Sequence, residues 1–332
     1  MVNDYTITLH TPADITKRRA ALSAFIWGAD GVPADRRPSS VTRSIPPPVS
    51  DLRNLDRVDE VRVAMEAGQE SLAHHFLPAK PNNRAIILHQ GHACTFDDRA
   101  TRPDGTYGLY GALDALLADG FAVVAMYMPH HRPDDCTDGH TAMFDIQTAG
   151  SPLKFFLEPV AACVNYLLSE TDSRGSPPYG EAAMVGFSGG GWTTIVYAAL
   201  DPRITLSCPI AGSLPLYLGY GSSRDLEQTL PAFYSLAGYP ELYVMGAYGP
   251  GRRQIQILNR RDTCCFGEAH VDATLGLSFA DAVHGFETRV QETLAAFGAG
   301  EFRVEIDEVS PGHAISPHAV QNVILPALQV VQ

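Results

Sequence analysis

The chain has little of what would mark a disulfide scaffold, a basic surface or a membrane span. Only 6 of its 332 residues are cysteine, too few for a disulfide framework in a chain of this length. No apolar run approaches the ~18 residues that a membrane helix requires. Lysine and arginine number 24 against 37 acidic residues, and the net charge is −13. Because an acidic surface repels phosphate backbones, we expect no nucleic-acid partner.

Several motifs are also missing. The sequence has no C-x-x-C pair and no H-E-x-x-H motif, so we expect no metal ion. It lacks the glycine-rich signatures of nucleotide binding, so we expect no cofactor. No basic leader followed by an apolar stretch opens the chain, which predicts a cytoplasmic protein. The adjacent cysteines Cys264 and Cys265 are unusual, and a redox role for them stays open.

The order of apolar and polar residues predicts two parts. For residues 1–55 the pattern predicts an arm that packs on the main domain, with a short helix near residues 13–25. The segment RRPSSVTRSIPPPVS is too rich in proline and serine for a central strand. Residues 56–332 predict one α/β domain, since 45% of the chain is apolar and 18% is charged, as a large core requires.

Within this domain, short apolar runs typical of strands alternate with amphipathic stretches typical of helices. The predicted strands are 58–66, 70–79, 84–90, 121–129, 181–187, 203–212, 253–261 and 302–310. The predicted helices are 109–120, 158–170, 190–201, 279–298 and 316–329. This alternation favours a doubly wound, mostly parallel sheet. Residues 213–250 interrupt it with many tyrosines and no clear strand, which predicts a small helical cap insert.

The most informative motif is AAMVGFSGGGW, in which Gly186-Phe187-Ser188-Gly189-Gly190 matches G-x-S-x-G. A predicted strand precedes Ser188 and a predicted helix follows it, which is the context that a nucleophile elbow requires. On so tight a turn, side chains two residues either side of the serine would collide, so both positions are glycine. The alternative is a glycine-rich turn with an incidental serine. A phosphate-binding loop is disfavoured because the G-K-[ST] ending is absent.

With this motif, residues 56–332 resemble the α/β-hydrolase superfamily in its serine-esterase form. The resemblance implies the chain order serine, acid, histidine, each in a loop after a strand. QIQILNRRDTCCF then supplies Asp262 as the acid, and VEIDEVSPGHAIS supplies His313 as the base. Both follow strands at the carboxyl edge of the sheet, where open α/β sheets place their sites.

Three other residues compete for these roles. Asp201 precedes a strand and so lies at the wrong edge of the sheet, while Asp307 falls within the last predicted strand. His318 would lie in the first turn of the last helix, beyond the loop. Position therefore favours Asp262 and His313.

The resemblance also implies an oxyanion hole. The N–H of Gly189 is one expected donor, and the loop His89-Gln90-Gly91-His92 should supply the other. Gln90 stands where glycine is usual, so the second donor stays open between Gly91, which alignment on His89 favours, and its neighbours.

Three side chains are candidates for substrate binding: His92 in this loop, and Tyr220 and Tyr234 in the predicted cap. The two tyrosines could equally be plain core of the cap.

The sequence thus predicts a serine hydrolase that cleaves a small-molecule carboxylic ester through an acyl-enzyme. An amidase or acyltransferase would use the same triad. A catalytically silent binding protein on this fold is the alternative from another class, and an aspartate nucleophile is disfavoured by Ser188. The sequence does not predict an oligomeric state.

Overall fold

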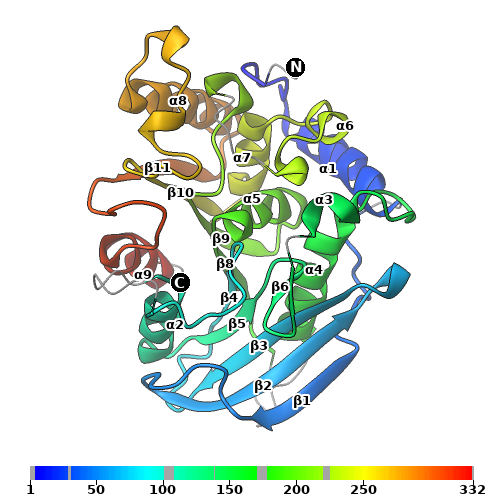
Figure 1. The fold of residues 1–332 in the computed structure, drawn as a ribbon. Coiled ribbons are helices and arrows are strands. Elements are labelled where there is room, and N and C mark those ends of the chain that lie inside the picture. Colours follow the sequence, from blue (N-terminus) through cyan, green and yellow to red (C-terminus); the bar gives the residue numbers. More distant parts are fainter. Residues whose placement is uncertain are drawn as a thin grey trace.

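The computed structural model describes residues 4–28, 31–100, 108–137, 139–169, 178–219 and 225–330. Its centre is a nine-stranded sheet in the order β1-β2-β3-β5-β4-β8-β9-β10-β11 (Figure 1). The strands are β1 (Ser40–Ile45), β2 (Leu55–Ala64), β3 (Glu70–Pro78), β4 (Ala85–His89), β5 (Ala122–Met126), β8 (Ala182–Phe187), β9 (Ile204–Ile210), β10 (Arg253–Asn259) and β11 (Glu301–Asp307). β5, β4, β8, β9, β10 and β11 run parallel to one another, whereas β1 with β2, β2 with β3 and β3 with β5 pair antiparallel. This architecture confirms the predicted fold class.

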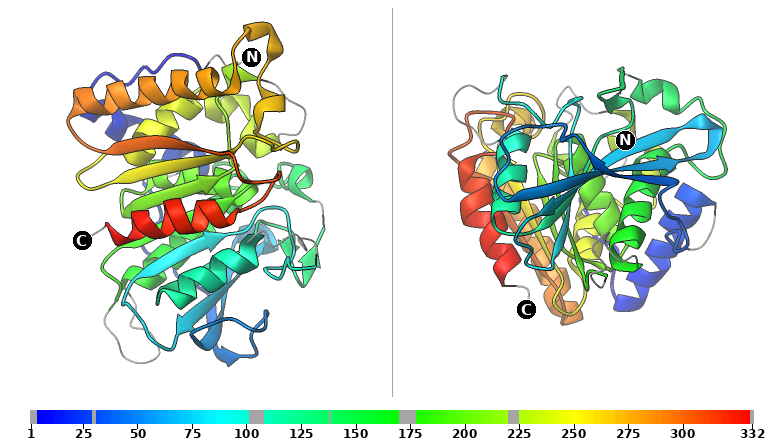
Figure 2. Two further views of the ribbon diagram at one scale, coloured as in Figure 1. Left: turned by 90° about the vertical axis from the view of Figure 1, so that its left-hand side faces the viewer. Right: turned by 90° about the horizontal axis from the view of Figure 1, so that it is seen from below.

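Helices cover both faces of the sheet (Figures 1 and 2). One face packs against α1 (Pro12–Trp27), α4 (Lys154–Ser169), α5 (Gly189–Leu200), α7 (Tyr239–Ala247) and α8 (Phe279–Phe297). The other packs against α2 (Gly108–Ala118), a π-helical turn η6 (Ala319–Ile324) and α9 (Leu325–Gln329). Because the central strands are covered on both faces, β4, β5 and β8 are buried along their whole length, as their apolar runs predict.

The strand order reverses at β4, and this reversal positions the site. β4 has β5, the next strand of this sheet along the chain, as its neighbour on one side and β8, which comes later, as its neighbour on the other. The loops that follow β4 and β8 therefore diverge at the carboxyl edge of the sheet. Such a switch point leaves a crevice in which α/β proteins bind ligands.

The N-terminal arm is more regular than its sequence predicts. α1 starts and ends close to the expected helix, but the proline-rich segment contains β1, which extends the sheet by pairing with β2. Arg19 fixes α1 to the core, since its guanidinium donates to the carbonyls of Ala199 and Met245 at 2.8 and 2.9 Å. The sequence gives little sign of β1 because this edge strand buries no side chain completely.

Much of the predicted cap region belongs to the main fold. α7 packs against α5 and α8 and connects the parallel strands β9 and β10. The rest consists of short pieces: η2 (Leu216–Leu218), η3 (Leu226–Gln228) and α6 (Pro231–Tyr234). Residues 220–224 lie outside the described part of the chain. We therefore propose a cap only for the shorter stretch that ends near residue 238.

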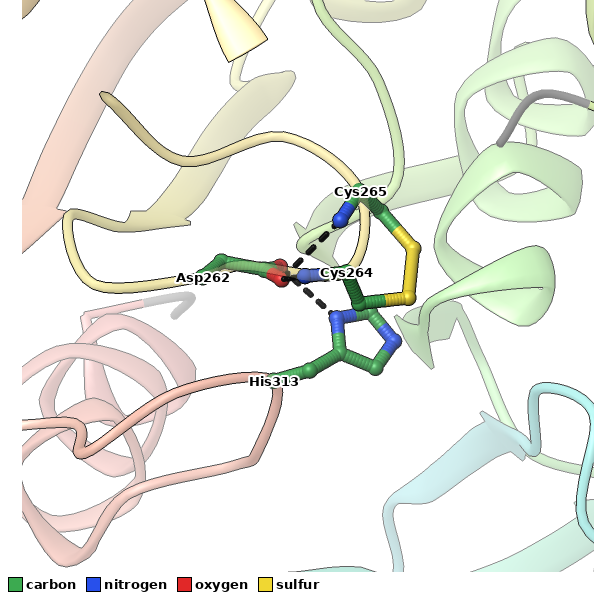
Figure 3. A group of neighbouring side chains, drawn as sticks. All are labelled: Asp262, Cys264, Cys265 and His313. Carbon is green, nitrogen blue, oxygen red and sulfur yellow. Dashed lines mark hydrogen bonds and ion pairs between the residues drawn. A yellow bond between two sulfur atoms is a disulfide. The ribbon is translucent and has the colours of Figure 1, made fainter. Parts of the chain in front are cut away.

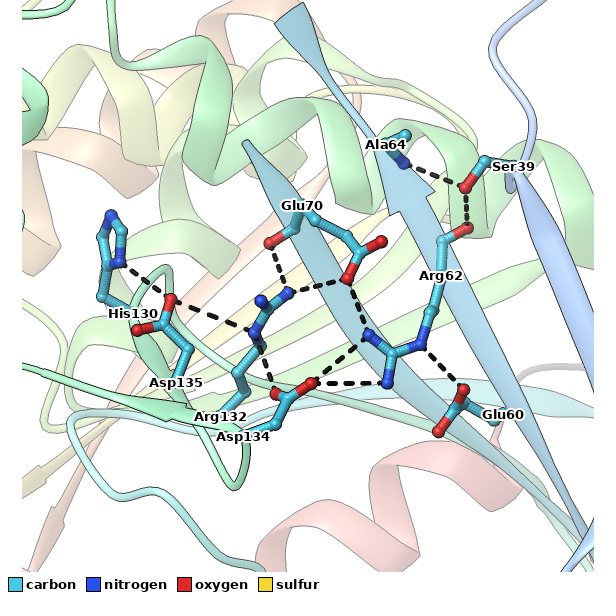
Figure 4. A network of polar contacts seen from close by, with 9 residues as sticks. All are labelled: Ser39, Glu60, Arg62, Ala64, Glu70, His130, Arg132, Asp134 and Asp135. Atoms are coloured by element: carbon cyan, nitrogen blue, oxygen red, sulfur yellow. Dashed lines mark hydrogen bonds and ion pairs between the residues drawn. The ribbon is translucent and has the colours of Figure 1, made fainter. Parts of the chain in front are cut away.

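A small hairpin beside the crevice, β6 (His131–Arg132) and β7 (Asp135–Cys136), is attached to the sheet by ion pairs (Figure 4). The carboxylate of Glu70 in β3 accepts from Arg62 at 2.6 Å and from Arg132 at 3.1 Å. Asp134 contacts both guanidinium groups. A network of this kind holds an element in place better than an isolated surface pair.

Cys136 of this hairpin forms a disulfide with Cys94 in the loop after β4. The short helix α3 (His140–Met143) follows the hairpin. In the described part of the chain, no helix combines the length and apolar character needed to cross a membrane.

Candidate active site

The turn between β8 and α5 has the geometry that the G-x-S-x-G motif predicts. Ser188 has φ 57° and ψ −121°, a conformation that side chains rarely adopt. A Cβ on Gly186 would lie 2.1 Å from the carbonyl oxygen of Gly190, and one on Gly190 would lie 2.3 Å from that of His89. Both glycines are therefore required for steric reasons. Ser188 stands at the start of α5, where helix N–H groups favour negative charge.

Asp262 and His313 come together from two different loops. Asp262 lies three residues after β10, and His313 lies in the loop after β11. The carboxylate Oδ2 of Asp262 is 2.7 Å from His313 Nδ1, and its Oδ1 accepts the N–H groups of Cys264 and Cys265 at 2.9 and 3.1 Å (Figure 3). Because an ionised carboxylate only accepts, Nδ1 carries the proton, and in the neutral imidazole Nε2 is the nitrogen that can accept one.

The electrostatics of Asp262 suit this role. Burial by itself would raise the pKa of its carboxyl, but the hydrogen bond and charge of His313, together with the two N–H groups, hold that pKa below its ordinary value. Asp262 is therefore ionised at neutral pH. Nε2 of His313 faces away from Asp262 (Figure 3).

Ser188 and His313 line one pocket of about 350 Å³, here called the Ser188 pocket. Its other lining residues are Gln90, His92, Ala93, Phe187, Asp225, Gln228, Cys264, Cys265 and Phe266. The imidazole of His313 packs on the Phe187 ring, with centroids 4.7 Å apart. The structure thus places Ser188 and His313 on one pocket at the carboxyl edge of the sheet, with Asp262 hydrogen-bonded to His313 beside it.

The competing residues lie elsewhere. Asp201 is bound by Arg203 and Tyr197 at the end of α5. Asp307 ends β11 and accepts the N–H groups of Val309 and Ser310. His318 pairs with Glu305 at 3.0 Å.

The loop after β4 corrects one expectation about the oxyanion hole. The side chain of Gln90 folds back, so that its Oε1 accepts the N–H of Gly91 at 2.9 Å while its Nε2 donates to the carbonyl of Thr95 at 2.7 Å. The N–H of Gly91 is therefore engaged within the loop. Gly91 instead gives Ser188 room, since a Cβ there would lie 2.7 Å from the Ser188 Cβ. Gly189 opens α5, so its N–H has no acceptor within the helix.

Of the predicted substrate-binding residues, His92 lines the Ser188 pocket. Partial burial, with the imidazoles of His140 and His131 nearby, lowers the pKa of His92 to about 3. Tyr220 lies outside the described residues. Tyr234 is 1% exposed and does not line the pocket, because its hydroxyl is bound between Trp192 Nε1 at 2.7 Å and the Tyr239 hydroxyl at 2.8 Å. Its place is in the core, which corrects its assignment to substrate.

Sequence reasoning missed two features of the site. Asn259, the last residue of β10, donates to the carbonyls of Gly312 and Ala314 at 2.9 and 2.7 Å and so holds the His313 loop from both sides. A polar residue at the end of an apolar strand, three positions before the acid, was the available signal. The second feature is the disulfide between Cys264 and Cys265, which forms part of the pocket wall (Figure 3).

Comparison with known proteins finds matches among solved structures only. A scan against models of protein families finds no match, and neither does a search of curated proteins. An acetyl xylan esterase from Paenibacillus sp. R4 matches with a TM-score of 0.58 at 14% identity, over 99% of this chain and 98% of that chain. Acetyl xylan esterase 1 from Thermoanaerobacterium sp. JW/SL YS485 matches with a TM-score of 0.57 at 12% identity, over 100% of this chain and 98% of that chain. Methylesterase BT1017 matches with a TM-score of 0.56 at 15% identity, over 96% of this chain but only 62% of that chain.

Identities this low are informative about the fold alone. The matches extend over almost the whole chain, and the sheet order, the elbow after β8 and the loops after β10 and β11 agree with the predicted architecture. The chain therefore has the α/β-hydrolase fold.

Proposed function

We propose that this protein is a serine hydrolase that cleaves a carboxylic ester through an acyl-enzyme. The observation that carries the proposal is the hydrogen bond between Asp262 and His313, because His313 lines the same pocket as Ser188 on its strained turn. The fold neighbours support an ester as substrate, because the three described above are two acetyl xylan esterases and a methylesterase.

In the first half of the reaction, Ser188 attacks the ester carbonyl while Nε2 of His313 takes its proton. Asp262 keeps the imidazole in the required tautomer and stabilises its charged form. His313 then protonates the leaving alcohol, which departs and leaves the acyl group on Ser188. In the second half, a water attacks the acyl-enzyme with His313 again as base.

The negative charge of the tetrahedral intermediate needs two donors. Gly189 supplies one N–H from the start of α5. We assign the second to the main-chain N–H of His92, because that of Gly91 is engaged by Gln90 and because His92 is the next residue on the same loop and lines the pocket. No step requires a metal ion or cofactor.

A fluorophosphonate probe tests the nucleophile. Wild-type protein should be labelled covalently at Ser188, and Ser188→Ala should remove both the label and the hydrolysis of nitrophenyl esters. Ser235→Ala is a matched control, since Ser235 is an exposed serine whose hydroxyl donates to the nearby carbonyl of Ala232. Labelling that survives in Ser188→Ala would refute the assignment. Folded wild-type protein that takes no label would support the catalytically silent alternative.

A further inference from the structure

Four side chains with metal-binding atoms converge beside the Ser188 pocket. They are His92 from the loop after β4, His140 from α3, Asp225 just before η3, and Glu227 within η3. His92 and Asp225 also line the pocket. One donor atom of each of the four lies within 4.8 Å of the others. Three segments far apart in the sequence thus bring possible metal-ligand atoms to one place.

Three of the six separations between these donor atoms have the length expected around a tetrahedral ion. His92 Nε2 is 3.3 Å from His140 Nδ1, His92 Nε2 is 3.3 Å from Asp225 Oδ2, and His140 Nδ1 is 3.3 Å from Glu227 Oε1. Zinc binds nitrogen and oxygen ligands at about 2.0–2.1 Å, so tetrahedral ligands lie roughly 3.3 Å apart. Three edges of the donor set therefore already have the length that a bound ion would impose.

The burial of Glu227 calls for a cation. Its side chain is 0% exposed, and within the described ranges the imidazole of His140, 3.3 Å from Oε1, is the contact recorded for its carboxylate, which has no hydrogen bond of good geometry. A buried carboxylate is costly unless a positive charge compensates it, and either a protonated His140 or a bound metal ion can supply that charge here. When an ion is bound, both imidazoles are neutral ligands, so the four side chains carry a charge of −2, which one divalent ion would balance.

The tautomer of His140 suits a ligand. Its Nε2 is 2.9 Å from the carbonyl oxygen of Pro129, which can only accept, so Nε2 carries a proton. In the neutral imidazole, Nδ1 then has its lone pair toward His92 and Glu227. A ligand histidine whose other nitrogen donates to a carbonyl is the usual arrangement around protein-bound metals. The disulfide between Cys94 and Cys136 further holds the segments that carry His92 and His140 together.

We propose that His92, His140, Asp225 and Glu227 bind a divalent transition-metal ion, with Zn²⁺ as the best fit to two nitrogen and two oxygen ligands. The ion would join the loop after β4 to α3 and to η3 at the edge of the Ser188 pocket. This role goes beyond the proposed hydrolysis, and metal binding at this site does not depend on whether the protein is a hydrolase. It also departs from the sequence-based expectation of no metal, because no two of these ligands share a zinc-binding spacing.

Calorimetry with Zn²⁺ tests the site. Full-length protein stripped with a chelator and dialysed, without reductant, should take up one Zn²⁺ per chain, and Co²⁺ in its place should give the visible absorption of a tetrahedral ion. Glu227→Gln keeps the shape and should weaken binding at least roughly 10-fold, since even residues behind the ligands change metal affinity this much. Asp225→Asn alters a partly exposed ligand, so it serves if Glu227→Gln does not fold. His318→Gln is the matched control, because His318 pairs with a glutamate outside the cluster.

Two further variants separate this site from its neighbours. Asp262, Cys264, Cys265 and His313 form another group of possible ligands, so Asp262→Asn should leave Zn²⁺ uptake unchanged. Ser188→Ala should also bind Zn²⁺ normally, whether or not Ser188 proves to be the nucleophile. Absence of saturable uptake in the wild type would overturn the proposal. Uptake that survives in both Glu227→Gln and Asp225→Asn, or that is lost only in Asp262→Asn, would overturn it equally.

Discussion

Replacement of Asp262 by asparagine tests the triad sharply, because its surroundings dictate how the new amide must lie. Oδ1 of Asp262 accepts two main-chain N–H groups, those of Cys264 and Cys265, while Oδ2 faces His313 Nδ1. An asparagine NH₂ cannot face two N–H donors, so its oxygen must take the Oδ1 position. The NH₂ then donates to Nδ1 of His313. Because Nδ1 must accept this hydrogen bond, the neutral imidazole carries its proton on Nε2 instead.

An imidazole with its proton on Nε2 cannot take one from Ser188. In serine proteases the equivalent exchange lowers kcat about 10⁴-fold, which corresponds to about 5.5 kcal/mol of transition-state stabilisation. We expect kcat to fall by about 10²- to 10⁴-fold in Asp262→Asn. KM should change little, because Asp262 does not line the pocket.

The same variant has a signature in stability. The pKa of Asp262 is lowered in the folded protein, so its ionised form contributes stability above the unfolded-state value of about 3.9 and loses it as the pH falls through the folded-state pKa. The difference in the free energy of unfolding between wild type and Asp262→Asn should therefore shrink as the pH falls below the unfolded-state pKa of about 3.9. Urea unfolding at several pH values measures it.

The assay is the hydrolysis of nitrophenyl acetate, with fluorophosphonate labelling in parallel. Asp272→Asn is the matched control, since Asp272 also accepts a main-chain N–H, that of Thr274 at 2.8 Å, but lies on the surface with no histidine partner in the described structure. Near-normal turnover of Asp262→Asn would refute the reasoning and leave only Ser188 and His313 in the assignment.

Three further changes have definite expected outcomes. Asn259→Ala removes both hydrogen bonds that hold the His313 loop, so kcat should fall while KM is retained. Urea unfolding should show a free energy of unfolding lower by about 1–3 kcal/mol. An unchanged kcat would contradict the positioning role of Asn259. Tyr234→Phe leaves the Trp192 indole N–H without its partner and should lower the free energy of unfolding by about 1–3 kcal/mol, with equal kcat/KM ratios across acyl lengths; altered ratios would return Tyr234 to the substrate site. His318→Ala should keep most activity and His313→Ala almost none, and the reverse pattern would move the base.

The sequence predicts the elbow well because its determinants are contiguous. β8, the two glycines around Ser188 and α5 all fall within about twenty residues, and steric exclusion at Gly186 and Gly190 leaves no other residue type. The chain order of superfamily triads then leads to Asp262 and His313, although 51 residues separate them. The central strands are predictable for a similar reason, since burial on both faces requires continuous apolar runs.

Other features depend on contacts between distant residues, which no local pattern encodes. Tyr234 has the composition of a pocket residue, yet its hydroxyl is bound by Trp192, a residue 42 positions away. The N–H of Gly91 is lost to a side-chain rotamer of Gln90, and a sequence does not specify rotamers. The pairing of Cys94 with Cys136 depends on how hairpin β6–β7 docks. Because disulfides persist mainly in oxidising compartments, this pairing disfavours the cytoplasmic prediction, which stays untested.

The strained backbone of Ser188 has a consequence for the evolution and engineering of this chain. Residues in such regions of φ and ψ cost roughly 1–3 kcal/mol, whereas glycine adopts them freely and loses only about 0.5–1 kcal/mol through the greater freedom of the unfolded chain. Ser188→Gly should therefore be inactive yet at least as heat-resistant as the wild type. A screen that rewards thermal tolerance alone would drift toward loss of the nucleophile, and only a screen that also demands turnover would retain it.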